Sequence, residues 1–426
     1  LKQHKAVSEV MREMIAQHLR RISLTIHYAM AQDNNHGTSE AAALFIGGLL
    51  LSNNGGGGQA RRWQEKGRYW LENRVRHLIE KDGSFSQYSV NYHRLMLDAL
   101  CLSEVWRREH KQKPFSKVFY QRARAATVWL RALTCEQTGD VPNLGSNDGA
   151  WIMLLTDTDY CDFRPTVQLA AVLFCDARAY GAEGTYDQAL DLLNVSSLNH
   201  MDCQISQIFS DGGYVALKNK LATTFLRFPK FRFRPSHCDA LHLDLFVRGE
   251  NILRDGGSYK YNCDDKWLNY FSGTESHNTA QFDQRNQMTK ISRFLYGQWL
   301  SGHHDESVQK TPEHVSFSAG YTDWVGASHK RRITLIDNKV TVEDKVFGFK
   351  RGAVLRWRLI PGAWVLNGSM VSKRGIQIKV SSDSEVEKIE ICEGWESRYY
   401  GRKDSLPVLE VTVCRESTII TEISWV

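Results

Sequence analysis

The chain has 426 residues, with 54 Lys and Arg side chains against 48 Asp and Glu, which gives a formal net charge of +6. Apolar residues make up 42% of it and charged residues 24%, as in ordinary globular proteins, so a disordered, collagen-like or coiled-coil chain is excluded. The length predicts two or three domains. The longest uninterrupted apolar stretch, Ala41–Leu51, is too short for a membrane span.

Nine cysteines are too few for a disulfide scaffold in a chain of this length. No pair has the spacing of a zinc ribbon or a redox motif, so free thiols, typical of a reducing compartment, are expected. The chain begins at Leu1 without a recognisable secretory signal. These features leave the compartment open.

Helical patterns dominate the chain up to about residue 200. Apolar residues recur there at helical spacing, and short polar or glycine-bearing loops separate the segments. The expected helices are Ala6–Ala31, Ser39–Leu51, Gln59–Glu80, Val90–Glu109, Ser116–Thr134, Arg164–Tyr180 and Tyr186–Leu193. Residues 1–200 are therefore predicted to form a domain of helical hairpins.

Short alternating runs rich in Val, Ile, Thr and aromatic residues replace this pattern in residues 201–426. The expected strands are Gly213–Leu217, Ala240–Val247, Arg331–Asp337, Lys339–Lys345, Ala353–Leu359, Ile376–Ser381, Val386–Cys392 and Leu409–Cys414. They predict an antiparallel β-sandwich. With few prolines and no low-complexity linker, the two domains should pack together, and a cleft between them is the default site.

Three polar segments in the helical half could carry chemistry. Asp33–Glu40 and Gln87–Arg94 stand at helix starts, where turns and N-caps are the simpler interpretation. Pro142–Ala150 is a polar glycine loop that could shape the chain or line a sugar-binding groove.

The β half holds a richer set of polar residues. His237, Asp255 and His277 are spread over three β segments, and two His with one Asp can form a zinc site with one open position. The spacing is long, and a lone His in a strand is more often packed and hydrogen-bonded. Both interpretations stay open at this point.

Taken in order, these segments resemble the heparinase II/III superfamily of polysaccharide lyases, which has relatives acting on alginate. An Asn-His pair at a helix start is matched by Asn35 and His36, and a tyrosine followed two places later by arginine is matched by Tyr92 and Arg94. The β half then carries three further matches, His-x-Asp-Ala at 237–240, an Asp-x-Gly-x-Tyr-like turn at 255–259 and Thr-x-x-His-Asn at 274–278.

The resemblance implies an N-terminal α/α toroid followed by an antiparallel β-sandwich, and the helices are too few for a complete toroid. It also implies a structural Zn²⁺ held by His237, Asp255 and His277. Pro235 stands where some members have a further His. The subgroup that this chain resembles occurs among bacterial surface-polysaccharide genes, and relatives that degrade polysaccharide are often periplasmic or secreted.

The activity implied is cleavage of a uronic-acid-containing acidic polysaccharide by β-elimination. Asn35 and Arg94 would neutralise the substrate carboxylate. His36 would act as a base or a further neutralising group. Tyr92 would protonate the leaving oxygen and in some geometries remove the proton, with its pKa lowered by Arg94 and His93 nearby.

Several further residues are candidates for substrate contact. A stretch at 227–234 alternates basic and aromatic residues from Lys230 on, as in a strand with one basic face, and could form a cleft wall or a merely solvated face. The individual candidates for binding substrate are His93, Asn147, Asp148, Lys260 and Tyr261.

Two other functions remain as alternatives. A glycoside hydrolase on the same scaffold would need two facing carboxylates, for which Asp148, Asp157 and Asp159 are candidates. A non-catalytic glycan-binding protein of surface-polysaccharide assembly is the other. The low overall charge and the lack of a binding motif argue against nucleic acid as a partner. The oligomeric state is not predicted.

Overall fold

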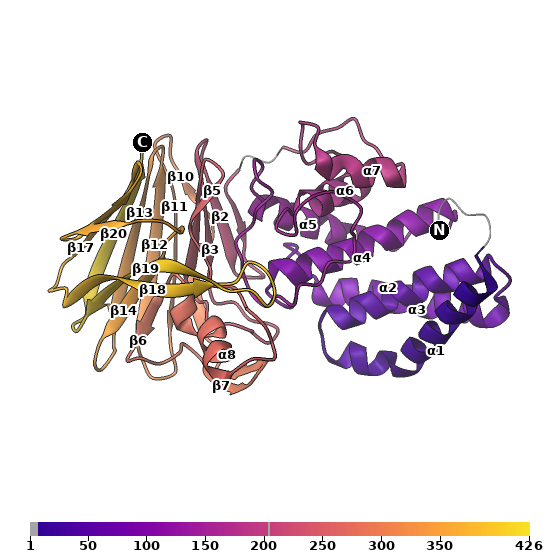
Figure 1. The fold of residues 1–426 in the computed structure, drawn as a ribbon, viewed down its shortest axis with the longest axis horizontal. Coiled ribbons are helices and arrows are strands. Elements are labelled where there is room, and N and C mark those ends of the chain that lie inside the picture. The colour runs from indigo at the N-terminus through magenta and orange to yellow at the C-terminus, as the bar shows by residue number, and fades with distance from the viewer. Residues whose placement is uncertain (1–6, 203–204) are drawn as a thin grey trace.

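The computed structural model describes residues 7–202 and 205–426. A helical part and a β part lie side by side along the long axis, with the N-terminal end in the helical part and the C-terminal end in the β part (Figure 1). The predicted order of helices followed by antiparallel sheets is confirmed. Each part has its own apolar core.

Seven α-helices make up the helical part within the described residues. They are α1 (Glu9–Ala31), α2 (Asn35–Ser52), α3 (Gly57–Leu78), α4 (Val90–Glu109), α5 (Lys117–Leu133), α6 (Arg164–Cys175) and α7 (Gln188–Leu193), the last preceded by a 3₁₀ turn, η1 (Thr185–Asp187). Helices α2 and α3 pack as a tight hairpin. A Cβ on Gly67 would lie 2.2 Å from the backbone nitrogen of Phe45, so only glycine permits this approach.

A five-stranded sheet opens the β part and packs against both cores. Its strands are β1 (Gln207–Phe209), β2 (Tyr214–Lys218), β3 (Ala222–Arg227), β4 (His242–Val247) and β5 (Glu250–Leu253), in sequence order. Phe209, Tyr214 and Phe225 belong to the core of the helical part, whereas Val215 and Leu226 belong to the core of the β part. The sheet therefore holds the two parts together.

A nine-stranded sheet forms the outer layer. Its strands are β9 (Ser301–His304), β10 (Gln309–Lys310), β11 (Val315–Thr322), β12 (Ser328–Ile336), β13 (Lys339–Phe347), β20 (Ser417–Trp425), β17 (Ile376–Ser382), β16 (Met370–Lys373) and β15 (Val365–Asn367). Burial alternates along β12, β13 and β20, so one face of each strand packs inward.

A four-stranded sheet and a hairpin complete the β part. The sheet contains β18 (Lys388–Glu396), β19 (Asp404–Val413), β14 (Ala353–Arg358) and β6 (Ala280–Phe282), the hairpin consists of β7 (Thr289–Ser292) and β8 (Leu295–Gly297), and the short helices are α8 (Asp265–Ser272) and η2 (Thr274–Ser276). Trp357 of β14 is fully buried in the core shared with the nine-stranded sheet.

Two predicted elements are wrong. The helix expected to reach Tyr180 ends at Cys175, because Asp176 has a left-handed backbone with φ of 53°. The basic stretch 227–234 is not a strand beyond Arg227, since no strand in the described part of the chain pairs with it. Instead the backbone N–H groups of Arg232 and Phe233 donate to the hydroxyl of Tyr88, at 2.9 and 3.1 Å, and draw the segment onto the helical part.

None of the helices in the described part of the chain combines the length and the apolar character that crossing a bilayer requires.

Candidate active site

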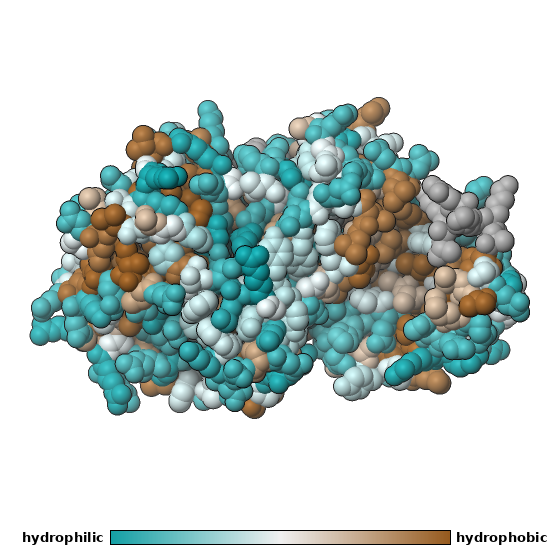
Figure 2. Space-filling view, in the orientation of Figure 1, coloured by the Kyte–Doolittle hydropathy of each residue, from teal (hydrophilic) through white to brown (hydrophobic). Residues whose placement is uncertain are grey.

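A cleft of about 370 Å³ lies where the helical and β parts meet. This is the junction at which the sequence predicted a site. On the face shown in Figure 2, hydrophilic and neutral residues occupy this junction, whereas apolar residues gather on either side of it, over the helical part and over the β part. The residues that line the cleft are Gln32, Asp33, Asn34, Asn35, His36, Ser86, Gln87, Tyr92, Ser146, Asp148, Arg234, Ser236, Tyr261 and Phe294.

The start of α2 brings Asn35 and His36 to the cleft. Asn34 caps this helix, and its side-chain oxygen accepts the His36 backbone N–H at 3.0 Å. Gln87 accepts the Asn35 N–H at 2.7 Å, which ties this helix start to the segment before α4. Among the described residues nothing hydrogen-bonds the side-chain amide of Asn35, so this donor is available to a ligand.

The start of α4 brings Tyr92 to the same cleft. Ser89 caps α4 by accepting the Tyr92 backbone N–H at 3.1 Å. The N-termini of α2 and α4 therefore both lie at the cleft, and the partial positive charge of a helix N-terminus favours an anionic ligand.

Tyr92 is held as a neutral phenol. Its hydroxyl lies 2.8 Å from that of Tyr261, which comes from the β part. Burial, then the proximity of Tyr261 and Asp148, raise the pKa of Tyr92 well above its usual value of 10. The expectation that Arg94 and His93 lower this pKa is wrong, because both side chains are buried in the helical part and neither contacts the hydroxyl.

His93 points away from the cleft and cannot contact a substrate there. Its ring is fully buried, stacks on Trp129 with 4.4 Å between centroids, and places Nε2 2.9 Å from the carbonyl oxygen of Ala126. Burial lowers the pKa of His93 to about 3, so the ring is neutral. Successive helix positions point about 100° apart, so Tyr92 and His93 face different surroundings.

Arg94 is also buried, with 1% of its surface exposed. Its guanidinium lies 4.3 Å from the ring centroid of Tyr160 and 4.2 Å from that of Phe163, and it donates to Asn91 Oδ1 at 3.0 Å and to the Tyr160 carbonyl oxygen. Through these contacts Arg94 stabilises the loop before α6. The predicted role in holding a substrate carboxylate is therefore not supported by its position.

Arg234 supplies a cation to the cleft in its place. It is exposed, lines the cleft, and has no ion-pair partner among the residues that the structure describes. The segment that carries it is fixed at Arg232, which pairs with Glu80 at 3.0 Å. The basic stretch was the sequence signal for this residue, but the sequence did not single out Arg234.

Two of the other candidates for substrate contact line the cleft, Asp148 and Tyr261. Asn147 and Lys260 do not. The side-chain oxygen of Asn147 accepts the Tyr160 hydroxyl at 2.7 Å and the Gly149 N–H at 2.8 Å, which shapes the loop.

The three carboxylates proposed for a hydrolase do not come together in the cleft. Of the three candidates, Asp148 lines it. Asp159 accepts the hydroxyl of Tyr399 at 2.8 Å, and Asp157 accepts the side-chain amide of Gln188 at 3.0 Å, both outside the cleft lining.

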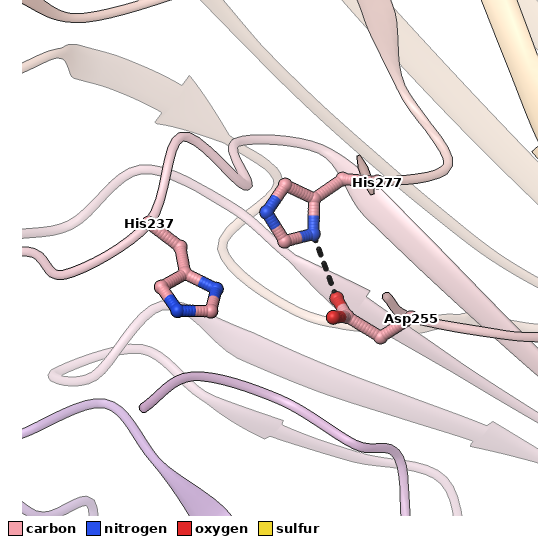
Figure 3. A group of neighbouring side chains, drawn as sticks. All are labelled: His237, Asp255 and His277. Atoms are coloured by element: carbon pink, nitrogen blue, oxygen red, sulfur yellow. Dashed lines mark hydrogen bonds and ion pairs between the residues drawn. The ribbon is translucent and has the colours of Figure 1, made fainter. Parts of the chain in front are cut away.

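His237, Asp255 and His277 form a buried cluster beside the cleft, called the His–Asp cluster below. Their ligand atoms all lie within 4.8 Å of one another. His277 Nδ1 is 2.8 Å from an Asp255 carboxylate oxygen, and the ring of His237 faces this pair (Figure 3). The three residues come from the loop before β4, the turn after β5 and the end of η2, so the structure brings three distant segments together.

The His–Asp cluster has the donor chemistry of a zinc site. Nδ1 of His237 is buried and has no hydrogen-bond partner in the described residues, and an unsatisfied buried polar atom is unfavourable unless a ligand engages it. Two imidazoles and a carboxylate are ligands that Zn²⁺ prefers. The residues present therefore fit the ion.

His242 supports the cluster, and the sequence did not assign it this role. Its Nδ1 accepts the backbone N–H of Asn278 at 2.9 Å, so the ring proton must be on Nε2. Nε2 donates to Asp244 at 2.6 Å and lies 3.4 Å from Asp255. This bond network orients the carboxylate of Asp255.

Comparison with known proteins agrees with this architecture. The chain matches the family described as Heparinase II/III-like, C-terminal, over residues 205–426, which is more than half of its length. Among curated proteins none matches this chain.

Solved structures match nearly the whole chain. A heparinase III gene product superposes with a TM-score of 0.74 at 15% identity, over 92% of this chain and 60% of the other. A heparan sulfate lyase from Pedobacter heparinus gives 0.68 at 17%, over 91% and 59%. A chondroitin AC lyase of Streptomyces coelicolor, in complex with chondroitin sulphate, gives 0.56 at 11%, over 91% and 60%.

This chain thus spans about 60% of the length of those structures. The likeness confirms the predicted fold class, a partial α/α toroid followed by an antiparallel β-sandwich. Together with the match over residues 205–426, it confirms the resemblance found in the sequence. The chain belongs to the heparinase II/III-like family.

Proposed function

We propose that this protein is a polysaccharide lyase that cleaves a uronic-acid-containing acidic polysaccharide by β-elimination. The observation that carries the proposal is the cleft itself, in which Asn35, His36, Tyr92 and Arg234 line one space although they come from three separate segments. Donors for a carboxylate, a basic group and a protonated phenol are the groups that this reaction needs.

The carboxylate of the uronic acid must be neutralised before the proton at C5 can leave. Removal of that proton places negative charge beside the carboxylate, and positioned donors stabilise the charge as it develops. We assign this role to the side-chain amide of Asn35 and the guanidinium of Arg234, in the field of the α2 and α4 N-termini.

Two proton transfers complete the elimination. His36 is exposed at the cleft, and its imidazole can accept the proton from C5. Tyr92 carries its proton because its pKa is raised, so it can donate that proton to the oxygen that departs from C4. The C4–O bond breaks, a C4–C5 double bond forms, and no water is consumed.

We further propose that the His–Asp cluster holds Zn²⁺ in a structural role. The bound ion would cross-link three β segments. Ser258 connects this site to the cleft, because its Oγ lies 3.3 Å from His237 Nε2, donates to the Gly145 carbonyl at 3.1 Å and accepts the Asn147 N–H at 3.1 Å. The ion would thereby fix the turn that presents Tyr261 to Tyr92.

One experiment separates the proposed activity from its alternatives. The protein is incubated with heparan sulfate, chondroitin sulfate, hyaluronan and alginate, and the ultraviolet absorbance of the unsaturated product is followed together with reducing ends. A lyase raises both signals, and a hydrolase raises reducing ends alone. If neither signal rises on any of these glycans, the proposed lyase is rejected in favour of a glycan-binding role.

A further inference from the structure

The β7–β8 hairpin presents a pair of exposed residues beside the cleft. It lies next to α8 at the edge of the β part (Figure 1). Its turn carries Arg293 and Phe294, both exposed to solvent. A bulge between Lys290 and Ser292 shifts the strand register just before this turn.

The base of the hairpin is firmly attached, so the exposure of its tip is a property of the fold. Tyr296 is buried, and its hydroxyl donates to the Ser272 carbonyl at 3.0 Å at the end of α8. Lys290 Nζ donates to the carbonyl of Leu268 at 3.0 Å and to the hydroxyl of Ser272 at 3.1 Å. These bonds hold both strands against α8.

Phe294 lines the cleft and contacts the tyrosine pair. Its ring meets that of Tyr261 at 85° with 4.9 Å between centroids, and Tyr261 in turn bonds the hydroxyl of Tyr92. Because the two rings meet nearly at right angles, they share only an edge-to-face contact, and 40% of Phe294 remains exposed. An exposed aromatic ring at a cleft wall can pack against the apolar face of a sugar ring.

Arg293 stands beside Phe294 with most of its donors unused. One nitrogen donates to Asn262 Oδ1 at 2.7 Å, and no carboxylate pairs with the guanidinium among the described residues. Arg293 and Phe294 also line a small hollow that shares Ser236 and Tyr261 with the cleft. The remaining guanidinium donors can bind a carboxylate or a sulfate in bidentate fashion.

We propose that Arg293 and Phe294 form a second sugar subsite, which binds the acidic sugar next to the one being cleaved. Phe294 packs against the ring of that sugar, and Arg293 binds its acidic group. The inference rests on the proposed function, because that function places the cleaved sugar at Tyr92. The subsite would make the protein prefer longer oligosaccharides, and its two residues take no part in the proton transfers of the elimination.

The test uses binding and turnover together. Oligosaccharides of defined length from heparan sulfate and hyaluronan are titrated against a Tyr92→Phe protein, which is not expected to turn them over. Phe294→Ala and Arg293→Gln are then added to that background. Each is expected to weaken binding of the longer oligosaccharides about tenfold, the effect of losing one good contact, and to leave the shortest bound oligosaccharide unaffected. A larger effect of Arg293→Gln on heparan sulfate than on hyaluronan would identify sulfate as the bound group.

Matched controls are exposed residues that do not line the cleft. Trp324→Ala removes an exposed aromatic ring and Arg332→Gln removes an exposed guanidinium elsewhere on the β part, and neither should change binding. The same hairpin and control variants are also made with Tyr92 intact, so that cleavage can be followed. If the hairpin variants bind every length like the controls in the Tyr92→Phe background and cleave every length like them with Tyr92 intact, the subsite is overturned while the lyase proposal stands. It is also overturned if the protein binds none of the oligosaccharides. If the hairpin variants weaken binding but the otherwise unchanged protein forms no unsaturated product, the subsite is supported and the lyase proposal fails.

Discussion

The cleft and the His–Asp cluster are neighbours with opposite characters. The cleft is open to solvent and lined by polar groups from both parts of the molecule. His237, Asp255 and His277 are almost completely buried, and a polymer cannot reach them. The proposed chemistry accordingly belongs to the cleft, and the proposed role of the cluster is to hold the loops that shape one of its walls.

The first turn of α4 repeats this contrast on a smaller scale. Tyr92 faces the cleft, whereas His93 and Arg94 are inserted into the helical part. Removing a cleft residue should therefore affect turnover more than stability, and removing a buried residue should do the reverse.

The largest expected effect follows from Tyr92→Phe. This change removes the proton donor but keeps the ring, so kcat should fall by about 10² to 10⁴, the usual contribution of a positioned acid or base, while oligosaccharide affinity changes little. The rate at which unsaturated product forms measures kcat, and calorimetric titration measures the oligosaccharide affinity. Tyr28→Phe, at an exposed position on α1, is the control. Turnover close to that of the unmodified protein would remove Tyr92 from the mechanism.

A somewhat smaller loss is expected from Arg234→Gln. Without its charge the substrate carboxylate is less well neutralised, and kcat/KM should fall by about 10² to 10³ with no change in melting temperature. Steady-state kinetics and thermal unfolding distinguish this from a folding defect. Equal kcat/KM for this variant and for Arg332→Gln would show that another cation performs the task.

Changes at the His–Asp cluster should act on stability. We expect the purified protein to contain stoichiometric zinc, and both chelation and His237→Ala should lower the melting temperature, by about 2 to 4 °C for each kcal/mol of stabilisation lost. Elemental analysis and thermal unfolding measure the two effects. A protein without zinc whose stability is unchanged by His237→Ala would reject the site.

The smallest expected effect concerns acid stability and His93. Its pKa is lowered by burial from 6.5 to about 3, so below pH 6.5 the unfolded chain binds a proton that the folded chain does not. The contribution of His93 to the free energy of unfolding is therefore fully present above pH 6.5, and it is lost as the pH falls toward 3. His93→Gln should therefore lose less stability than the unmodified protein between pH 7 and pH 4. Parallel melting-temperature curves for the two proteins would contradict the assignment.

Regular periodicity made much of the fold predictable. The helix predicted at Val90–Glu109 has the observed bounds, with Ser89 as its N-cap. Strand β13 begins at the predicted Lys339, because its burial alternates along the strand. The sequence did not reveal the strands between 280 and 322. Among them β7 and β9 are short and largely exposed, so they lack the buried alternation that identifies a strand.

The site was predictable where a motif coincides with a helix start. Asn35, His36 and Tyr92 were named from the sequence, and the structure brings them to one cleft. Arg94 was wrongly predicted to lie at the cleft, because adjacency in sequence does not reveal which face of a helix packs inward. Arg234 was predicted only as one of several basic residues in the stretch 227–234, because contacts with Glu80 and Tyr88, far away in the chain, determine where its segment lies.

The mass of the products tests the central claim most directly. A defined oligosaccharide that the protein cleaves is analysed by mass spectrometry. β-Elimination breaks the chain without water, so we predict that the two product masses sum to that of the substrate and that one product carries the double bond. Products whose masses together exceed the substrate by one water would contradict the lyase and identify a hydrolase.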